Sequence, residues 1–363
     1  LNCRKGTMNK RYSIIISCII TAVLVYFLML IITDDSDIDI IAETGATPVA
    51  LAQRIPSEIF LSVDGLVKHE YSFSGKTLNA FATTRIRTQE LSVDGKLIGT
   101  YSYIGIPVIH ILEGVVPKKT ENAVFDRPLD LIVTFISSNG NSAHYSYGEI
   151  VFADDALPVT LAFFREEIRA SKNPKTYEKN IFKEGLKGLR VISPRDSDTG
   201  RYLDNVIKIT LREPKVDYNI LPKQQKGIKC VSSAITCLWN NTIRAGKFNN
   251  VNRQRKDNWF RTGHGRGFKG ISNAEGYNLR SFLRRNFPEC SSKNYFLFVA
   301  CDGYRSLFSG REIFDTVQGA AMMILGTIDS KRANGGFMLA PVEDYFVDRN
   351  VWGLSYIIAL DNI

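Results

Sequence analysis

The sequence predicts an α+β fold, mainly β, in which two tandem copies of one domain follow an N-terminal transmembrane helix. Three observations lead to this prediction. A set of short motifs occurs twice in the same order, between about residue 56 and residue 363. Each copy contains β-prone runs that end in turn dipeptides. Residues 12–32 form an almost unbroken apolar run of the length that a bilayer requires.

Composition limits the class of protein. With 363 residues, of which 44% are hydrophobic, the chain is long enough for one large domain or two of ordinary size. Its formal net charge of +9 favours an anionic partner. Nucleic acid is a poor candidate, because the sequence has no zinc-finger spacing, RNA-binding aromatic motif or basic-zipper heptads. A Walker loop, a dinucleotide fingerprint and a Ser/His/Asp hydrolase pattern are also missing from the sequence.

The N-terminal part is predicted to anchor the protein in a membrane. Basic residues are concentrated in residues 1–11, and aspartates follow the apolar run. By the positive-inside tendency, residues 1–11 are a cytoplasmic tail, residues 12–32 are an uncleaved signal anchor, and the globular part lies outside, in the periplasm of a Gram-negative host. Residues 33–55 lack an apolar period, so we expect a flexible tether.

The internal repeat divides the rest of the chain into copies at residues 56–212 and 213–363. We align residues 83–88 with 232–237, 105–108 with 276–279, 138–150 with 301–313, and 194–209 with 341–357. The order of the motifs is the same in both copies and the later spacings are nearly equal. Such agreement at successive sites indicates a duplicated domain.

Local propensity gives both copies the same elements. Residues 131–136 and 295–300 are β-prone, and an Asn-Gly or Asp-Gly pair after each predicts a tight hairpin. After the return strand, a helix-prone segment begins near Glu149 in the first copy and near Glu312 in the second. We expect two paired strands to close each copy, at residues 189–192 and 206–211, and at residues 337–339 and 354–360.

Basic residues and glycines are concentrated in one part of the second copy. Between residues 223 and 285, only Asp257 and Glu275 oppose fourteen Lys and Arg residues. Such a field attracts anions, and glycines allow backbone N–H groups to approach a phosphate. We therefore expect a basic glycine loop, in an insertion at about residues 240–270 that the first copy lacks. The alternative is a solvated basic loop that faces acidic lipid.

The second copy also resembles the molybdopterin-binding domain of the sulfite oxidase family. In that family a strand ends in a molybdenum-ligating cysteine within a Cys-x-Gly-Asn motif, and a Gly-Asn-Ala segment and a Gly-Val-x-Leu helix start follow. The matching residues are Cys237 and Asn240, then Ile271, Asn273 and Ala274, then Gly276, Leu279 and Arg280. An Asp-Gly-Tyr-x-x-x-Phe-Ser-x-x-Glu pattern at residues 302–312 and the segment at residues 348–357 resemble the bacterial branch of the family.

The resemblance implies a membrane-anchored oxidoreductase with a molybdenum–pterin cofactor in the second copy. Cys237 would be the catalytic residue and the metal's thiolate ligand. The residues expected to bind the cofactor or a small anionic substrate are Asn240, His264, Arg266, Gly270, Asn273 and Arg280. The reaction would be oxygen-atom transfer to or from a small oxyanion or oxide, with an electron carrier as partner. We align Thr88 with Cys237, and because a hydroxyl cannot replace a thiolate on a soft metal, the first copy would be structural or a binding domain.

A function of a different class is also consistent with the sequence, namely a cofactor-free binding or scaffold protein on the same fold. The cysteines decide part of this choice. The second copy contains Cys230, Cys237, Cys290 and Cys301, and an even set outside the membrane predicts two disulfides. A disulfide at Cys237 would exclude a metal role for that residue.

Overall fold

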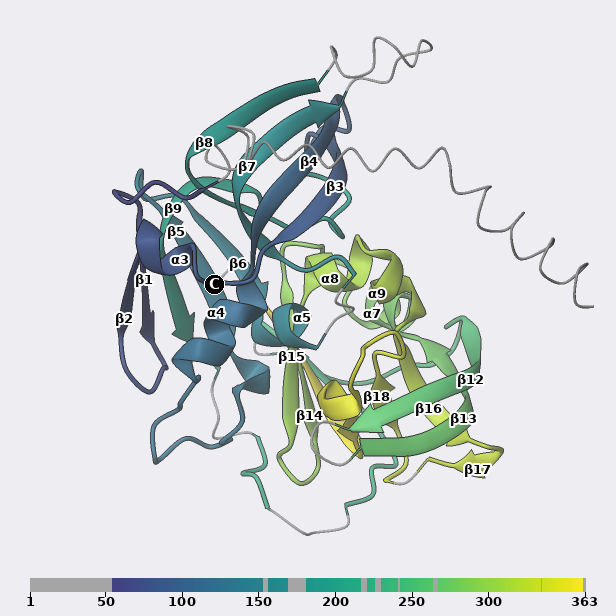
Figure 1. Cartoon of the computed structure of the whole chain (residues 1–363). Coiled ribbons are helices and arrows are strands. Elements are labelled where there is room, and N and C mark those ends of the chain that lie inside the picture. The colour runs from purple at the N-terminus through teal and green to yellow at the C-terminus, as the bar shows by residue number, and fades with distance from the viewer. Residues whose placement is uncertain are drawn as a thin grey trace, which may run out of the picture. The chain divides into compact units, whose positions relative to one another are not determined.

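The computed structural model describes residues 54–152, 156–168, 181–216, 221–225, 230–240, 242–263, 267–333 and 335–361, with a mainly β fold (Figure 1). The predicted tail and membrane span, and the tether up to residue 53, lie outside these residues. Ile55, at the end of the predicted tether, is buried, and its amide donates to the Asn79 side chain at 2.9 Å. Within the described ranges, no helix has the length and apolar character that crossing a membrane requires.

The first half is built on one continuous sheet. One part of it has the order β2-β1-β9-β5-β6, and only β1 and β9 in this part run parallel. The other part is the antiparallel series β3-β4-β7-β8, which joins the first part because β8 also pairs with β9. The strands are β1 (Phe60–Gly65), β2 (Tyr71–Ser74), β3 (Thr84–Leu91), β4 (Leu97–Pro107), β5 (Ile132–Ser137), β6 (Ser142–Ser146), β7 (Thr160–Ile168), β8 (Ile181–Ile192) and β9 (Leu203–Arg212).

The second half repeats this arrangement in two sheets. One has the order β11-β10-β20-β14-β15, and the other has the order β12-β13-β16-β18-β19, with β17 beside β16. The strands are β10 (Thr236–Trp239), β11 (Thr242–Ala245), β12 (Arg253–Gly263), β13 (Gly267–Asn278), β14 (Tyr295–Ala300), β15 (Arg305–Ser309), β16 (Met323–Ile328), β17 (Lys331–Arg332), β18 (Met338–Ala340), β19 (Val351–Trp352) and β20 (Leu354–Leu360). The expected pairing of the last two strands is found for β8 and β9 but not in this half, where β18 pairs with β16 and β19.

Short helices connect the strands at matching places in the two halves. Helix α4 (Val108–Val115) follows β4 directly, as α7 (Leu279–Asn286) follows β13. Helix α5 (Tyr147–Val151) follows β6, as α8 (Gly310–Phe314) follows β15. The others are α3 (Gly75–Leu78), α9 (Val317–Ala321), and the 3-10 turns η1 (Pro128–Asp130) and η4 (Val347–Arg349).

Strand register corrects the alignment of the two halves at Cys237. On β10, Cys237 lies opposite Ile357 of the parallel strand β20. In the first half, the residue in the same place on β1 is Val63, opposite Ile209 of β9. The predicted counterpart, Thr88, lies on β3, which corresponds to β12. The sequence alignment failed here because strand register depends on pairing between segments that are far apart in the chain.

The structure also corrects the predicted insertion in the basic stretch of the second half. The hairpin β12–β13 occupies the place of the hairpin β3–β4, so residues 240–270 are not an insertion with a loop of their own. Its outward residues face solvent, with an alternating pattern of exposure along β12. Polar and charged residues therefore occupy much of both strands, and the β-branched signal that predicts a strand is weak.

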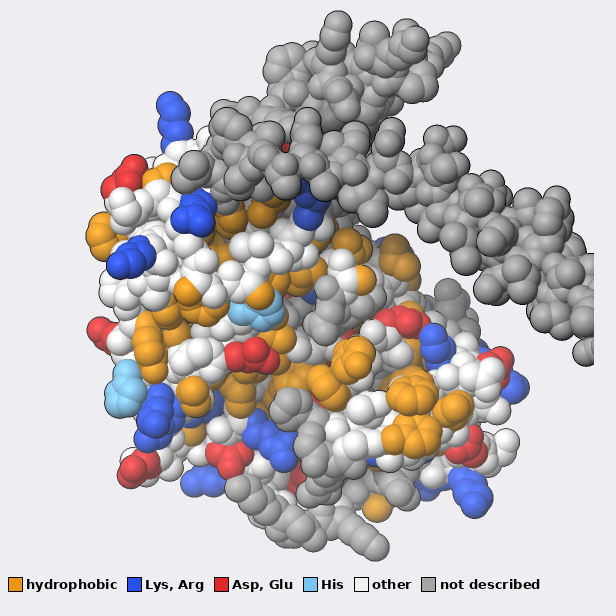
Figure 2. Space-filling model, in the orientation of Figure 1, with side chains coloured by type: hydrophobic (Ala, Val, Ile, Leu, Met, Phe, Trp, Pro, Cys, Tyr) orange, Lys and Arg blue, Asp and Glu red, His pale blue; other side chains and the backbone are white. Residues whose placement is uncertain are grey.

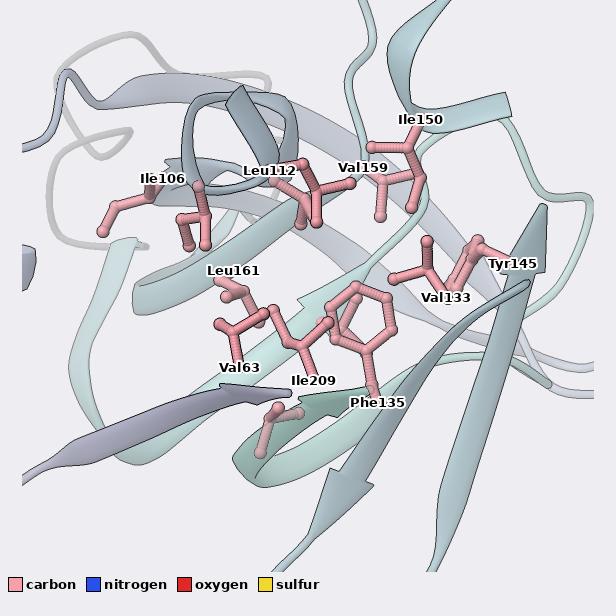
Figure 3. Close-up of a cluster of buried hydrophobic side chains, with 14 of the residues drawn as sticks. Val63, Ile106, Leu112, Val133, Phe135, Tyr145, Ile150, Val159, Leu161 and Ile209 are labelled. Atoms are coloured by element: carbon pink, nitrogen blue, oxygen red, sulfur yellow. The ribbon is translucent and has the colours of Figure 1, made fainter. Parts of the chain in front are cut away.

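Apolar side chains from both parts of the first sheet pack together in the core of the first half. Figure 3 shows Val63, Leu161 and Ile209 directed toward one another, with Phe135 beside them. Each such side chain is fully buried, which stabilises the fold by about 1.5–3 kcal/mol per residue relative to exposure. The place that Cys237 occupies in the second half is therefore a core position in the first.

A buried network of charged side chains joins the two halves. Arg201 donates to Glu149 Oε1 at 2.8 Å and to both carboxylate oxygens of Asp196 at 2.6 and 2.8 Å. The side chains that make the same contacts in the second half are Arg349, Glu312 and Asp344. Each guanidinium also lies over an aromatic ring, Arg201 over Tyr145 and Arg349 over Phe308.

Each half completes the network of the other. Ser146 and Ser309 are the N-cap residues of α5 and α8, and each accepts a hydrogen bond from its own helix. The Ser146 hydroxyl donates to Glu312 at 3.3 Å, while the Ser309 hydroxyl donates to Glu149 at 3.1 Å. Burial raises the pKa of both glutamates, so each carboxylate depends on its arginine and on these donors.

We predict that Arg349→Met destabilises the protein strongly, because it leaves Glu312 and Asp344 buried without their cation. The free energy of unfolding should fall by about 3–5 kcal/mol, measured by urea denaturation, and Arg201→Met should have a similar effect. Lys96→Met removes an exposed ion pair with Asp94 and serves as the control, with no measurable effect expected. Equal stability of the Arg349 and Lys96 variants would contradict the prediction.

Candidate functional site: an arginine-lined groove

Cys237 is a core residue with an unreactive thiol. Its side chain is 3% exposed and packs in the hydrophobic core of the second half. Burial raises the pKa of the thiol to about 12, and no cation offsets this shift. A cavity of only about 10 Å³ adjoins it, between Trp239, Arg244 and Phe287. That volume is enough for about one water molecule.

The residues around Cys237 do not fit a molybdenum–pterin group. Sites for ligands of that size are clefts of roughly 300–1,000 Å³, far larger than this cavity. In the described part of the chain, no three His, Cys, Asp or Glu side chains gather in a way that suits a metal ion.

The other predicted site residues that the structure describes do not line the cavity beside Cys237, and local structure explains most of them. Asn240 has φ 46° and follows β10 in the turn to β11, where asparagine tolerates a left-handed backbone. Gly270, with φ 109°, lies at an irregularity in the β12–β13 hairpin. The Asn273 side chain accepts from the Asn258 amide at 3.1 Å within the same hairpin. His264 and Arg266 lie outside the described residues.

The disulfide prediction is half right. Cys230 and Cys301 are bonded, which ties the segment before β10 to the turn between β14 and β15. Cys237 and Cys290 are free thiols, so the second predicted disulfide is wrong. Cys237 is held in the core by its strand, which explains why it has no bonded partner.

Among the predicted site residues that the structure describes, Arg280 lines a large groove. The groove has a volume of about 650 Å³ and lies between the start of β12, the end of β13 and helix α7. Four arginines line it, and no carboxylate is among its described lining residues. The lining residues are Asn250, Asn252, Arg253, Gln254, Asn278, Arg280, Ser281, Arg284, Arg285 and Ala320.

Hydrogen bonds hold the polar wall of this groove in place. Asn278 caps helix α7 by accepting from the Ser281 amide at 2.9 Å, and its amide group donates to Gln254 at 2.8 Å. The backbone N–H of Asn252 donates to the Ser281 hydroxyl at 3.0 Å. Arg280 donates to the carbonyl oxygens of Ile313 and Thr316. These contacts fix β12, β13 and α7 relative to one another.

The groove is electrostatically suited to an anion. Burial lowers the pKa of Arg280 and the charge of Arg284 lowers it further, so a bound anion would stabilise the charged guanidinium. Arg284 and Arg285 are exposed and have no carboxylate partner among the residues that the structure describes. Both lie in the last turn of α7, where the helix dipole stabilises a cation.

Sequence reasoning missed Arg253, Arg284 and Arg285 as site residues, although it identified the basic stretch that contains them. A signal for one of them, Arg284, was present. Leu279, Phe282 and Leu283 form the buried face of α7, which places Arg280 and Arg284 on another face, one turn apart. The contribution of Arg253 depends on the pairing of β12 with β13, which the sequence did not reveal.

Comparison with known proteins does not identify a family for this chain. No family model matches it. No curated protein matches it either. Among solved structures, it is similar to the sulfane dehydrogenase SoxCD from Paracoccus pantotrophus, with 10% sequence identity and a TM-score of 0.31, over 85% of this chain and 78% of that chain. A TM-score this low makes SoxCD a weak structural neighbour, from which we argue neither fold nor function.

We predict that Cys237 resists alkylation in the folded protein. Only the thiolate reacts, and a pKa of about 12 leaves roughly a thousandfold less thiolate at pH 8 than an ordinary cysteine has. Peptide mapping after treatment with iodoacetamide should find Cys237 unlabelled at pH 8 and labelled after unfolding in urea. A small-molecule thiol in the same solution is the control for the reagent. Labelling of native Cys237 at the rate of that thiol would show an accessible thiolate.

Proposed function

We propose that this chain is a cofactor-free binding protein whose ligand is a small anion with phosphate or similar oxyanion groups. The observation that carries the proposal is the groove beside α7, where Arg253, Arg280, Arg284 and Arg285 lie together without a carboxylate in the described lining. Guanidinium groups bind such oxyanions through paired hydrogen bonds. An anion would also relieve the repulsion between these cations.

The polar side chains of the groove support the same ligand class. Asn252 and Asn250 are exposed at its rim and offer amide donors, while Ser281 offers a hydroxyl. The groove is open to solvent, so a ligand can enter without a rearrangement of the fold. A volume of about 650 Å³ accommodates more than a single inorganic ion.

The molybdopterin-dependent oxidoreductase is the second candidate function. One observation favours it: Cys237, on a strand as in the sulfite oxidase family, is a free thiol. For this function the cavity beside Cys237, which is about 10 Å³, would have to enlarge by several hundred Å³. The substrate would then be a small oxyanion or oxide, and an electron carrier would be a further partner. Either function would be exercised on the extracytoplasmic side of the predicted membrane anchor.

We predict that removing two groove arginines weakens anion binding. Inorganic pyrophosphate serves as the probe, and isothermal titration calorimetry measures its Kd. Arg284→Ala combined with Arg285→Ala should raise the Kd by about tenfold or more, since each charge-assisted hydrogen bond is worth roughly 1.5–3 kcal/mol. Binding to the wild-type protein should weaken as salt is added.

The matched control is Lys331→Ala combined with Arg332→Ala, which removes an exposed basic pair on β17 away from the groove lining. This variant should bind pyrophosphate like the wild-type protein. If both double variants weaken binding equally, only net charge matters and the groove is not the site. If the wild-type protein does not bind pyrophosphate or sulfate at low salt, the proposal is wrong.

A further inference from the structure

The tip half of the β12–β13 hairpin carries apolar side chains on its solvent face. Phe260, Phe268 and Ile271 are 60%, 59% and 58% exposed. The two rings are in contact, with their centroids 4.7 Å apart, and Phe260 lies directly opposite Ile271 in the strand pairing. We call these three residues the hairpin patch. Figure 2 shows hydrophobic side chains exposed over this part of the molecule.

The backbone is shaped to assemble this patch. Phe268 and Ile271 are three residues apart, so in a regular strand their side chains would point to opposite faces. A β-bulge intervenes, because Arg261 pairs with Gly270 while the next residue, Thr262, pairs with Phe268. The bulge turns Phe268 onto the face of Ile271. Gly270 has φ 109°, a backbone conformation that other residues rarely adopt, which explains why glycine is present there.

The other face of the same segment is ordinary core. Trp259, which precedes Phe260, is 1% exposed and pairs with Ser272, which is also buried. The inward positions of this segment are thus filled as the fold requires, and the patch lies on the opposite face. Three neighbouring apolar side chains on the outward face have no structural use within the described residues, and such patches mark interaction surfaces.

Charge around the patch indicates the partner. The described residues of β12 and β13 include five Lys and Arg residues and two acidic residues. Both acids, Asp257 and Glu275, form ion pairs with Arg255, at 2.6 and 3.2 Å. Lys269, next to Phe268, has no carboxylate partner among the described residues, whereas Arg261 lies over the inward Trp259 ring and Arg253 lines the groove beside α7. The described part of the hairpin thus combines the apolar patch with a neighbouring free lysine and a net positive charge.

The β3–β4 hairpin, which holds the equivalent place in the first half, differs in charge. It also has exposed apolar residues near its turn, since Val93, Leu97 and Ile98 are 72%, 70% and 49% exposed. There, however, Asp94 and Lys96 form an ion pair with each other at 2.8 Å, and the tip has no excess of positive charge. The two hairpins therefore provide an internal comparison between an apolar tip with cations and one without.

We propose that the hairpin patch docks on the surface of an anionic lipid bilayer. Aromatic side chains insert at the boundary between headgroups and acyl chains, and neighbouring Lys and Arg side chains bind acidic headgroups. Each cation near such a surface contributes about 1 kcal/mol. This proposal concerns a surface separate from the ligand site of the groove and does not depend on it.

Single-stranded nucleic acid fits this surface less well. Base stacking needs free ring faces, but Phe260 and Phe268 lie against each other with planes inclined by 31°. Ile271, the third member, has no π-face to offer. The patch also presents no polar side chain of its own for contact with a base edge.

The test is depth-dependent quenching of a tryptophan in the full-length chain. Phe268→Trp is reconstituted in nanodiscs whose lipids carry bromine in their acyl chains, and wild-type protein gives the background of its three tryptophans. In phosphatidylglycerol discs, bromine should reduce the added fluorescence at least twofold. In phosphatidylcholine discs the reduction should be much smaller, and adding Lys269→Glu should diminish quenching in the acidic discs. Leu97→Trp, in the equivalent hairpin, is the matched control and should stay unquenched.

Several outcomes would overturn the proposal. Absence of quenching of the Phe268→Trp signal in acidic discs would show that the patch does not meet the bilayer. Equal quenching in both lipids, or in the Leu97→Trp control, would show that the cations do not direct docking. Protection from aqueous acrylamide without bromine quenching would identify another part of the chain, or a second copy, as the cover. A fluorescence change on adding a single-stranded oligonucleotide, with none on adding lipid, would identify nucleic acid instead.

Discussion

The crossed hydrogen bonds between Ser146 and Glu312 and between Ser309 and Glu149 are the interaction on which the rest of this structure depends. Each joins a helix cap of one half to a buried carboxylate of the other. Buried ion networks lose much of their Coulombic gain to desolvation, so this one contributes specificity rather than a large net stability. Neither half satisfies its own glutamate without the serine of the other.

This network also positions the groove. Glu312 belongs to α8, and its carbonyl accepts from the Thr316 hydroxyl at 2.7 Å. The same hydroxyl caps α9 by accepting from the Gly319 amide at 2.9 Å. The Thr316 carbonyl in turn accepts from Arg280, which lines the groove. A short chain of hydrogen bonds therefore links the contact between the halves to an arginine of the ligand site.

Much of the fold was predictable where local chemistry is decisive. The hairpins β5–β6 and β14–β15, and the helices that follow them, were predicted because β-prone runs and Gly turns act over a few residues. The structural equivalence of Cys237 and Val63 was not predictable, because it depends on strand register over a long sequence separation. The groove was missed for a similar reason, because Arg253 and Arg284 come together only when a hairpin packs beside a helix. Cys237 was assigned a metal role from its motif, whereas its burial is decided by the sheet around it.

We propose that the chain binds an anion without a molybdenum–pterin cofactor. The most direct measurement is the molybdenum, tungsten and pterin content of the full-length protein purified from membranes of cells that load other molybdoenzymes, with Cys237→Ser purified alongside. We predict no stoichiometric metal or oxidisable pterin in either preparation, since the surroundings of Cys237 leave a cavity of only about 10 Å³. About one metal and one pterin per chain in the wild-type protein, lost in Cys237→Ser, would contradict the account and establish the oxidoreductase.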